Sequence, residues 1–115
     1  MKVFFLLLIT IHGLIHTLGF VKAFKPDRVP QLTRDISRPL GLLWLSDCLL
    51  FIATAFLYYS GQDAWWIFGT AAILISQTLI ILFWRDAKFG TIANIILCIP
   101  VIMAAIGKLP PGFGN

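Results

Sequence analysis

Two histidines, His12 and His16, stand four residues apart in the run "IHGLIHTLGF", which contains few other polar side chains. Imidazole exchanges protons near neutral pH and binds metal ions. Residues four apart also lie on one face of a helix. The pair therefore predicts a proton-handling or metal-binding site inside an apolar segment.

Three later apolar runs each contain one conspicuous polar residue: Asp47, Gln77 and Asn94. We counted about 1.5 Å per residue from the end of each run nearest the basic loops. His16 and Asp47 then lie about 12 Å deep, Gln77 about 10 Å and Asn94 about 8 to 9 Å. The sequence thus predicts one polar layer. An ionised aspartate at mid-span costs about 2.5 to 3.5 kcal/mol, so we expect Asp47 to face inward and hydrogen-bond to His16.

Three interpretations of this layer remain open. Polar side chains often hold membrane helices together, each contributing about 0.6 kcal/mol. Alternatively, His16, Asp47, Gln77 and Asn94 bind a small solute or relay protons for transport, with His12 extending the chain. In a third interpretation His12, His16 and Asp47 hold a metal, or a histidine from each of two copies binds haem, although no particular cofactor is predicted.

Catalytic signatures are missing from the sequence, which favours a protein that is not an enzyme. There is no GxSxG motif, no cysteine and histidine pair with an orienting group, and no acidic cluster for phosphoryl chemistry. We therefore predict no catalytic residues.

The composition indicates lipid as the solvent of this chain. Apolar residues make up 59% of it and charged residues 12%, whereas soluble domains average about 25% charged residues. The net charge of +4 is concentrated in residues 25–39 and 84–88 rather than spread along a surface, so it does not indicate nucleic-acid binding.

The apolar runs are long enough to cross a bilayer, which takes about 20 residues per helix. We expect an all-α, up-down four-helix bundle in the membrane, formed by one domain (1–108) and followed by a Pro- and Gly-rich tail (109–115). The predicted spans are about 3–24, 39–60, 64–84 and 88–107.

Local signals support these span boundaries. Ser37 and Pro39 suit the start of the second helix, and Asp63 and Asp86 are predicted to cap the third and fourth. Glycines in the first two spans predict close helix packing; these are Gly13, Gly19 and Gly41.

Basic residues gather at one end of the predicted bundle, where they also suit binding to lipid headgroups. They are Lys22, Lys25, Arg28, Arg34, Arg38, Arg85 and Lys88, against only Lys2 and Lys108 at the other end. The positive-inside rule then predicts cytoplasmic basic loops and both termini outside. We interpret the start, "MKVFFLLLITI", as a retained span rather than a signal peptide.

The step "GFVK", Gly19 to Lys22, resembles the end of the first helix in DoxX-like small membrane proteins. With "HGLIHTLGFVKAF", "ISRPLGLLWL" and "FWRDAKFGTIAN", the whole chain is similar to a group of uncharacterised bacterial four-span proteins. The DoxX-like resemblance implies a four-helix fold and an accessory role in a membrane redox system. The second resemblance implies a bacterial inner-membrane protein and brings no established reaction with it.

Small multidrug-resistance transporters are similar in length and number of spans. They use a glutamate in the first helix, and this chain has none, so His16 or Asp47 would have to take its role. Small bundles of this kind often dimerise, so the expected partners are the lipid bilayer, a second copy or another membrane protein.

Overall fold

The computed structural model describes residues 2–109, and all regular structure in that range is helical. The elements are α1 (Lys2–Ile15), α2 (Thr17–Phe24), the short 3-10 helix η1 (Pro26–Arg28), α3 (Arg38–Tyr59), α4 (Trp65–Leu82), α5 (Trp84–Ala87) and α6 (Gly90–Ala105). The predicted all-helical bundle is confirmed. Except for Leu109, the predicted tail at 109–115 lies outside the described residues.

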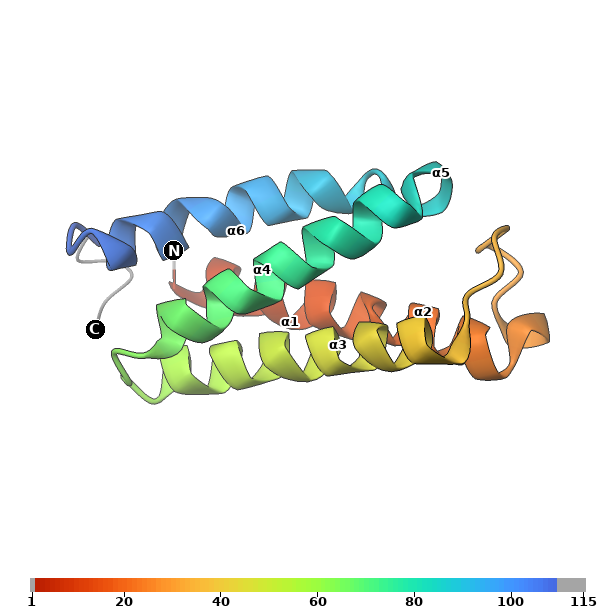
Figure 1. Cartoon of the computed structure of the whole chain (residues 1–115). Helices are drawn as coiled ribbons and strands as arrows, with labels where there is room; N and C mark the ends of the chain where they lie inside the picture. Colours follow the sequence, from red (N-terminus) through yellow and green to blue (C-terminus); the bar gives the residue numbers. More distant parts are fainter. Residues whose placement is uncertain (1, 110–115) are drawn as a thin grey trace.

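The long helices lie side by side and alternate in direction (Figure 1). α1 and α2 follow one path, α3 returns beside them, and α4 and α6 form the other side of the bundle. The segment between α2 and α3 lies at the same end as α5. The start of α1, the α3–α4 turn and the end of α6 lie at the opposite end. The bundle measures 45 × 22 × 20 Å, long enough to cross about 30 Å of hydrocarbon.

Three helical segments are long and apolar enough to cross a membrane, which makes this a helical protein with candidate transmembrane helices. They are Lys2–Phe24, Arg38–Tyr59 and Trp65–Leu82, with mean hydropathies of 2.0, 2.0 and 1.8. Only 33 to 39% of the residues in their most apolar stretches are buried inside the bundle, so the rest can face lipid. α6 is apolar but has only 16 residues.

The helix ends agree only partly with the expected caps. Ser37 does cap α3, since its hydroxyl accepts a hydrogen bond from the Leu40 amide at 3.4 Å. The caps predicted at Asp63 and Asp86 are wrong. Ala64 precedes α4 without a side-chain hydrogen bond. Asp86 lies inside α5, and the last long helix begins only at Gly90, preceded by Phe89.

Glycines allow α1 and α2 to pack closely on α3, as the sequence predicted. A Cβ atom at any of these positions would collide with a neighbour: Gly13 with Phe51, Gly19 with the Trp44 ring, and Gly41 with Ala23. This close approach brings the middle of α3 within reach of polar side chains on the first span.

The end of the bundle away from the basic loops is filled with apolar side chains. Phe5, Tyr58 and Trp65 pack edge to face, with ring centroids 4.8 to 5.5 Å apart. They belong to a cluster that we call the apolar core, made up of Phe5, Ile9, Phe51, Ala55, Tyr58, Trp65, Ala72, Ile73, Leu97 and Val101.

Candidate functional site

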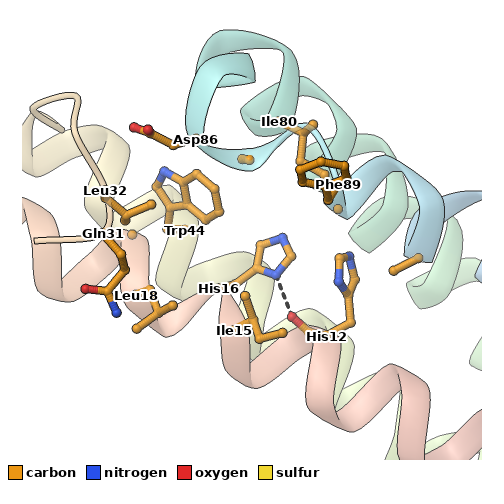
Figure 2. Close-up of a pocket in the computed structure, with 14 residues that line it drawn as sticks. His12, Ile15, His16, Leu18, Gln31, Leu32, Trp44, Ile80, Asp86 and Phe89 are labelled. Carbon is orange, nitrogen blue, oxygen red and sulfur yellow. Dashed lines mark hydrogen bonds between the residues drawn. The ribbon is translucent and has the colours of Figure 1, made fainter. Parts of the chain in front are cut away.

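The first span is interrupted at His16, and this interruption orients the His16 ring. The His16 amide bonds to the carbonyl of Gly13 at 3.1 Å, one residue short of the usual helical partner. The carbonyl of His12 is therefore left to the His16 side chain, whose Nδ1 lies 2.7 Å from it (Figure 2). A carbonyl only accepts hydrogen bonds, so Nδ1 carries the proton and Nε2 faces the neighbouring helices.

His16 and Asp47 form a buried pair. Their side chains are 2% and 0% exposed, and Nε2 lies 3.1 Å from Oδ2. This is ion-pair distance, although the contact lacks hydrogen-bond alignment, and neither oxygen of Asp47 has a hydrogen-bond partner among the described residues. With Nδ1–H bonded to the His12 carbonyl, a further proton shared by the pair can lie on His16 Nε2, giving imidazolium with carboxylate, or on Asp47 Oδ2, giving imidazole with carboxylic acid. One proton can move between Nε2 and Oδ2 while the pair keeps a net charge of zero.

Ser76 connects this pair to the rest of the layer. Its Oγ lies 2.9 Å from His16 Nε2 and accepts a hydrogen bond from Asn94 Nδ2 at 3.1 Å. Asn94 Oδ1 in turn lies 2.8 Å from His12 Nε2, which donates to it. When His16 Nε2 carries no proton, the Ser76 hydroxyl can donate to it. The chain of hydrogen bonds is therefore continuous from His16 to His12, and Asp47 adjoins it through the 3.1 Å contact with His16.

A branch of the network runs along the interface of α4 and α6. Asn94 Nδ2 also donates to Gln77 Oε1 at 3.1 Å, and Gln77 Nε2 donates to Thr91 Oγ1 at 3.1 Å. The connected polar groups thus come from α1, α3, α4, α6 and the break between α1 and α2.

The structure brings together the four residues predicted for the layer, which are His16, Asp47, Gln77 and Asn94, and it joins His12 to them. The contact that joins His12 to the network is its hydrogen bond to Asn94. Ser76 was missed, because a lone serine in an apolar helix most often bonds to its own backbone. Only its position next to Gln77 could have pointed to it. A functional role for these residues stays a prediction.

A pocket of about 420 Å³ opens beside the network, between the first span and the α5–α6 region. His12 and His16 form its polar inner end, and Trp44, Ile80 and Phe89 are among its mostly apolar walls (Figure 2). A small solute in this pocket would lie against both imidazole rings. The pair buried behind His16 could then exchange a proton with it.

Trp44 contributes an unusual polar group to this region. The residue is 6% exposed, and its indole Nε1 has no hydrogen-bond partner among the described residues. In Figure 2 the indole nitrogen lies on the side of the ring away from His16. Leaving a buried donor unpaired costs about 1 to 3 kcal/mol, so the group calls for an explanation.

The loop after η1 and α5 line the side of the pocket away from His12, which we call its mouth (Figure 2). Gln31 and Leu32 line it on the loop side, and Asp86 lines it on the α5 side. The Asp86 carboxylate accepts from the Thr33 amide at 3.0 Å, the Thr33 hydroxyl at 2.7 Å and the Arg34 amide at 3.0 Å. These bonds hold the loop against α5.

The Thr33 hydroxyl makes the largest contribution to lowering the pKa of Asp86, and the two backbone amides and Arg85 add to it. A lowered folded-state pKa means that this contact stabilises the loop fully above the ordinary carboxyl pKa of about 3.9. We expect the contact to be lost as the pH falls below that value.

Replacing Asp86 with asparagine should therefore loosen the loop at neutral pH. The expected result is a several-fold drop in the hydrogen-exchange protection of the Thr33 and Arg34 amides, measured by NMR. Asp35 is the matched control, because it is an exposed aspartate of the same loop. An Asp35→Asn variant should keep the wild-type protection, and equal protection in the Asp86→Asn variant would contradict the proposed contact.

The predicted headgroup-binding residues all lie at the loop end of the bundle, in different environments. Lys22 is buried, and its ammonium donates to the Val29 carbonyl at 3.5 Å, which suits anchoring the loop better than reaching lipid. The Arg34 guanidinium donates to the Leu82 carbonyl at 2.6 Å. The remaining five are exposed: Lys25, Arg28, Arg38, Arg85 and Lys88. Headgroup binding stays a prediction.

The proposed metal ligands are already engaged with protein groups. His12 Nε2 bonds to Asn94, and His16 Nε2 lies against Ser76 and Asp47. Within residues 2–109, no group of three or more His, Cys, Asp or Glu side chains could hold a metal ion. Binding of a metal or haem would require these side chains to give up their contacts, so the residues as arranged do not fit such a group.

In comparisons with known proteins, no family model, no curated protein and no solved structure matches this chain.

Proposed function

We propose that the chain is an integral membrane protein with four spans, α6 being the fourth. The apolar surface of the long helices and the gathering of basic residues at one end support this topology. By the positive-inside rule, the loop end with the pocket mouth faces the cytoplasm and both ends of the chain face outward. The resemblance to DoxX-like and other bacterial four-span proteins suggests the inner membrane.

The function that the geometry supports best is binding of a small solute coupled to proton exchange. The observation that carries this proposal is the buried pair of His16 Nε2 and Asp47 Oδ2, 3.1 Å apart, at the inner end of the 420 Å³ pocket. A net-neutral pair can accept or release a proton when a solute changes its surroundings. Intramembrane ionisable residues of this kind commonly mark solute and proton pathways.

Access to the pair is from one side of the bundle in this conformation. The pocket and its mouth lie at the loop end, whereas the apolar core fills the other end. A solute or proton taken up from the loop side therefore cannot pass directly through. Transport would require the helices to rearrange, and the break at His16 is a place where the first span can bend.

The test uses proteoliposomes that contain a pH-sensitive dye. A panel of small organic acids, organic cations and neutral amphiphiles is added outside, and solute-driven change of internal pH is recorded. We expect at least one solute to give a signal with the wild type. Asparagine at position 47 keeps the volume of the side chain but cannot carry the proton, so Asp47→Asn should reduce that signal about tenfold or more.

Asp63 provides the matched control, because it is an exposed aspartate in the α3–α4 turn. Its change to asparagine should leave the signal unchanged. If the polar layer only holds the helices together, no solute will give a signal that depends on Asp47, and the proposed function is then wrong.

A further inference from the structure

The pocket carries information on the class of molecule that it binds. We propose that it takes a neutral molecule dissolved in the bilayer, whose head carries a hydrogen-bond-accepting oxygen, and that the Trp44 indole N–H binds this oxygen. The inference rests on the proposed function, because it names the kind of solute for the same site.

The unpaired indole is the first observation behind this proposal. Trp44 lines the pocket, is nine-tenths buried and lacks a hydrogen-bond partner for Nε1 within the described part of the chain. An indole nitrogen only donates, so its complement is an oxygen or another acceptor. A ligand oxygen would satisfy this donor after a small movement of the indole ring or its neighbours, because Nε1 has almost no exposed surface in this conformation.

The charges around the pocket favour a neutral head. The walls are mostly apolar, and an ion in such surroundings loses its hydration without a counterion. When His16 and Asp47 share one proton between Nε2 and Oδ2, the pair has a net charge of zero and offers no counterion. At the mouth, the Asp86 carboxylate would repel a carboxylate or phosphate group. A carbonyl or similar neutral oxygen meets these conditions, and an anionic headgroup does not.

The outer wall indicates where the molecule comes from. Ile15 and Phe89 both line the pocket, yet they are 52% and 73% exposed on the outside of the bundle. Ile15 is the last residue of α1, and Phe89 directly precedes α6. The pocket therefore reaches the outer surface of the bundle between the first span and the last helix. An apolar tail could extend through this gap into the bilayer while the oxygen stays inside.

The experiment compares two probes that differ only in the oxygen: the long-chain ketone 2-dodecanone and the alkane dodecane. The full chain is placed in lipid nanodiscs, and apparent affinities are obtained from the rise in unfolding temperature with probe concentration. We expect the wild type to bind the ketone about fivefold more tightly than the alkane, as one neutral hydrogen bond would give. In a Trp44→Phe variant this ratio should fall to about one.

Two controls locate the effect. Trp84 is half-exposed on α5, outside the pocket, and its change to phenylalanine should keep the wild-type ratio. Ala93 lines the pocket, whereas Ile95 on the same helix does not. We expect Ala93→Phe to weaken binding of both probes at least tenfold and Ile95→Phe to leave it unchanged.

Any of three results would overturn the proposal. The Trp44→Phe variant could keep the wild-type ratio of ketone to alkane affinity, the wild type could bind the two probes equally tightly, or the wild type could bind neither probe. These outcomes are separate from failure of the proposed function. A charged or fully water-soluble solute that still drives Asp47-dependent proton exchange would leave the proposed function standing and remove only this inference.

Discussion

Changing His16 to leucine is expected to lower the free energy of unfolding by about 3 to 5 kcal/mol, because it leaves a buried carboxyl group without a partner. Asp47 is fully buried, and His16 Nε2 is the polar atom that lies beside it. Unfolding in detergent, followed by circular dichroism, measures the loss. The same variant should also abolish solute-driven proton exchange, since the imidazole that faces the pocket is gone.

The reciprocal change should cost less. In an Asp47→Leu variant, His16 keeps its bonds to Ser76 and to the His12 carbonyl, so we expect a loss of about 1 to 2 kcal/mol. The double variant with leucine at both positions should recover more than half of the His16→Leu loss, because an apolar pair replaces a polar one. Equal small losses that simply add in the double variant would contradict a coupled pair.

His12 gives a milder comparison within the same network. His12→Phe removes the donor to Asn94 but leaves the His16 and Asp47 pair intact. We therefore expect it to lower the free energy of unfolding by only about 1 kcal/mol.

Changing Gly41 to alanine is expected to cost about 2 kcal/mol, although alanine normally favours a helix. The new Cβ atom would overlap the Cβ atom of Ala23 on α2, so the two helices must move apart. Because Asp47 lies six residues further along α3, the same movement should weaken its contact with His16. The free energy of unfolding, measured by denaturation in detergent, and the proton-exchange signal should therefore both decrease.

A second substitution at the same contact should reverse the effect of Gly41→Ala. Adding Ala23→Gly to the Gly41→Ala variant removes the opposing Cβ atom and should recover most of the lost stability. Gly69→Ala on α4 is the control, since its Cβ would lie 3.2 Å from two methyl groups and needs only a small adjustment. If Ala23→Gly fails to restore the Gly41→Ala variant, close packing of α2 on α3 does not explain the loss.

The sequence was sufficient to predict the polar layer, because depth along a straight helix depends only on residue count. His16, Asp47, Gln77 and Asn94 come together as that count indicated. The glycine contacts were predictable for a similar reason, since a missing side chain on an apolar helix suggests a close neighbour.

Other features depend on tertiary contacts that the sequence does not display. No proline or glycine at position 16 announces the break in the first span. The break becomes understandable only once the His16 ring is seen bonded to the His12 carbonyl. Asp86 fits the pattern of a helix cap, yet it lies in α5, where Thr33 and Arg34 offer it three hydrogen bonds. The pocket arises from how distant segments meet, and no single run encodes it.

The apolar core has an electrical consequence for the proposed function. A membrane voltage falls mainly across the region that excludes water and mobile charge, and here that region is the end of the bundle filled by the apolar core. If water fills the pocket as far as the two histidines, loading a proton onto the His16 and Asp47 pair from the loop side crosses only the small part of the voltage that falls outside the apolar core. Releasing it on the other side crosses most of the voltage, which amounts to about 2.3 kcal/mol per 100 mV. The membrane potential would thus control proton release, whereas proton loading would depend mainly on the groups that surround the pocket.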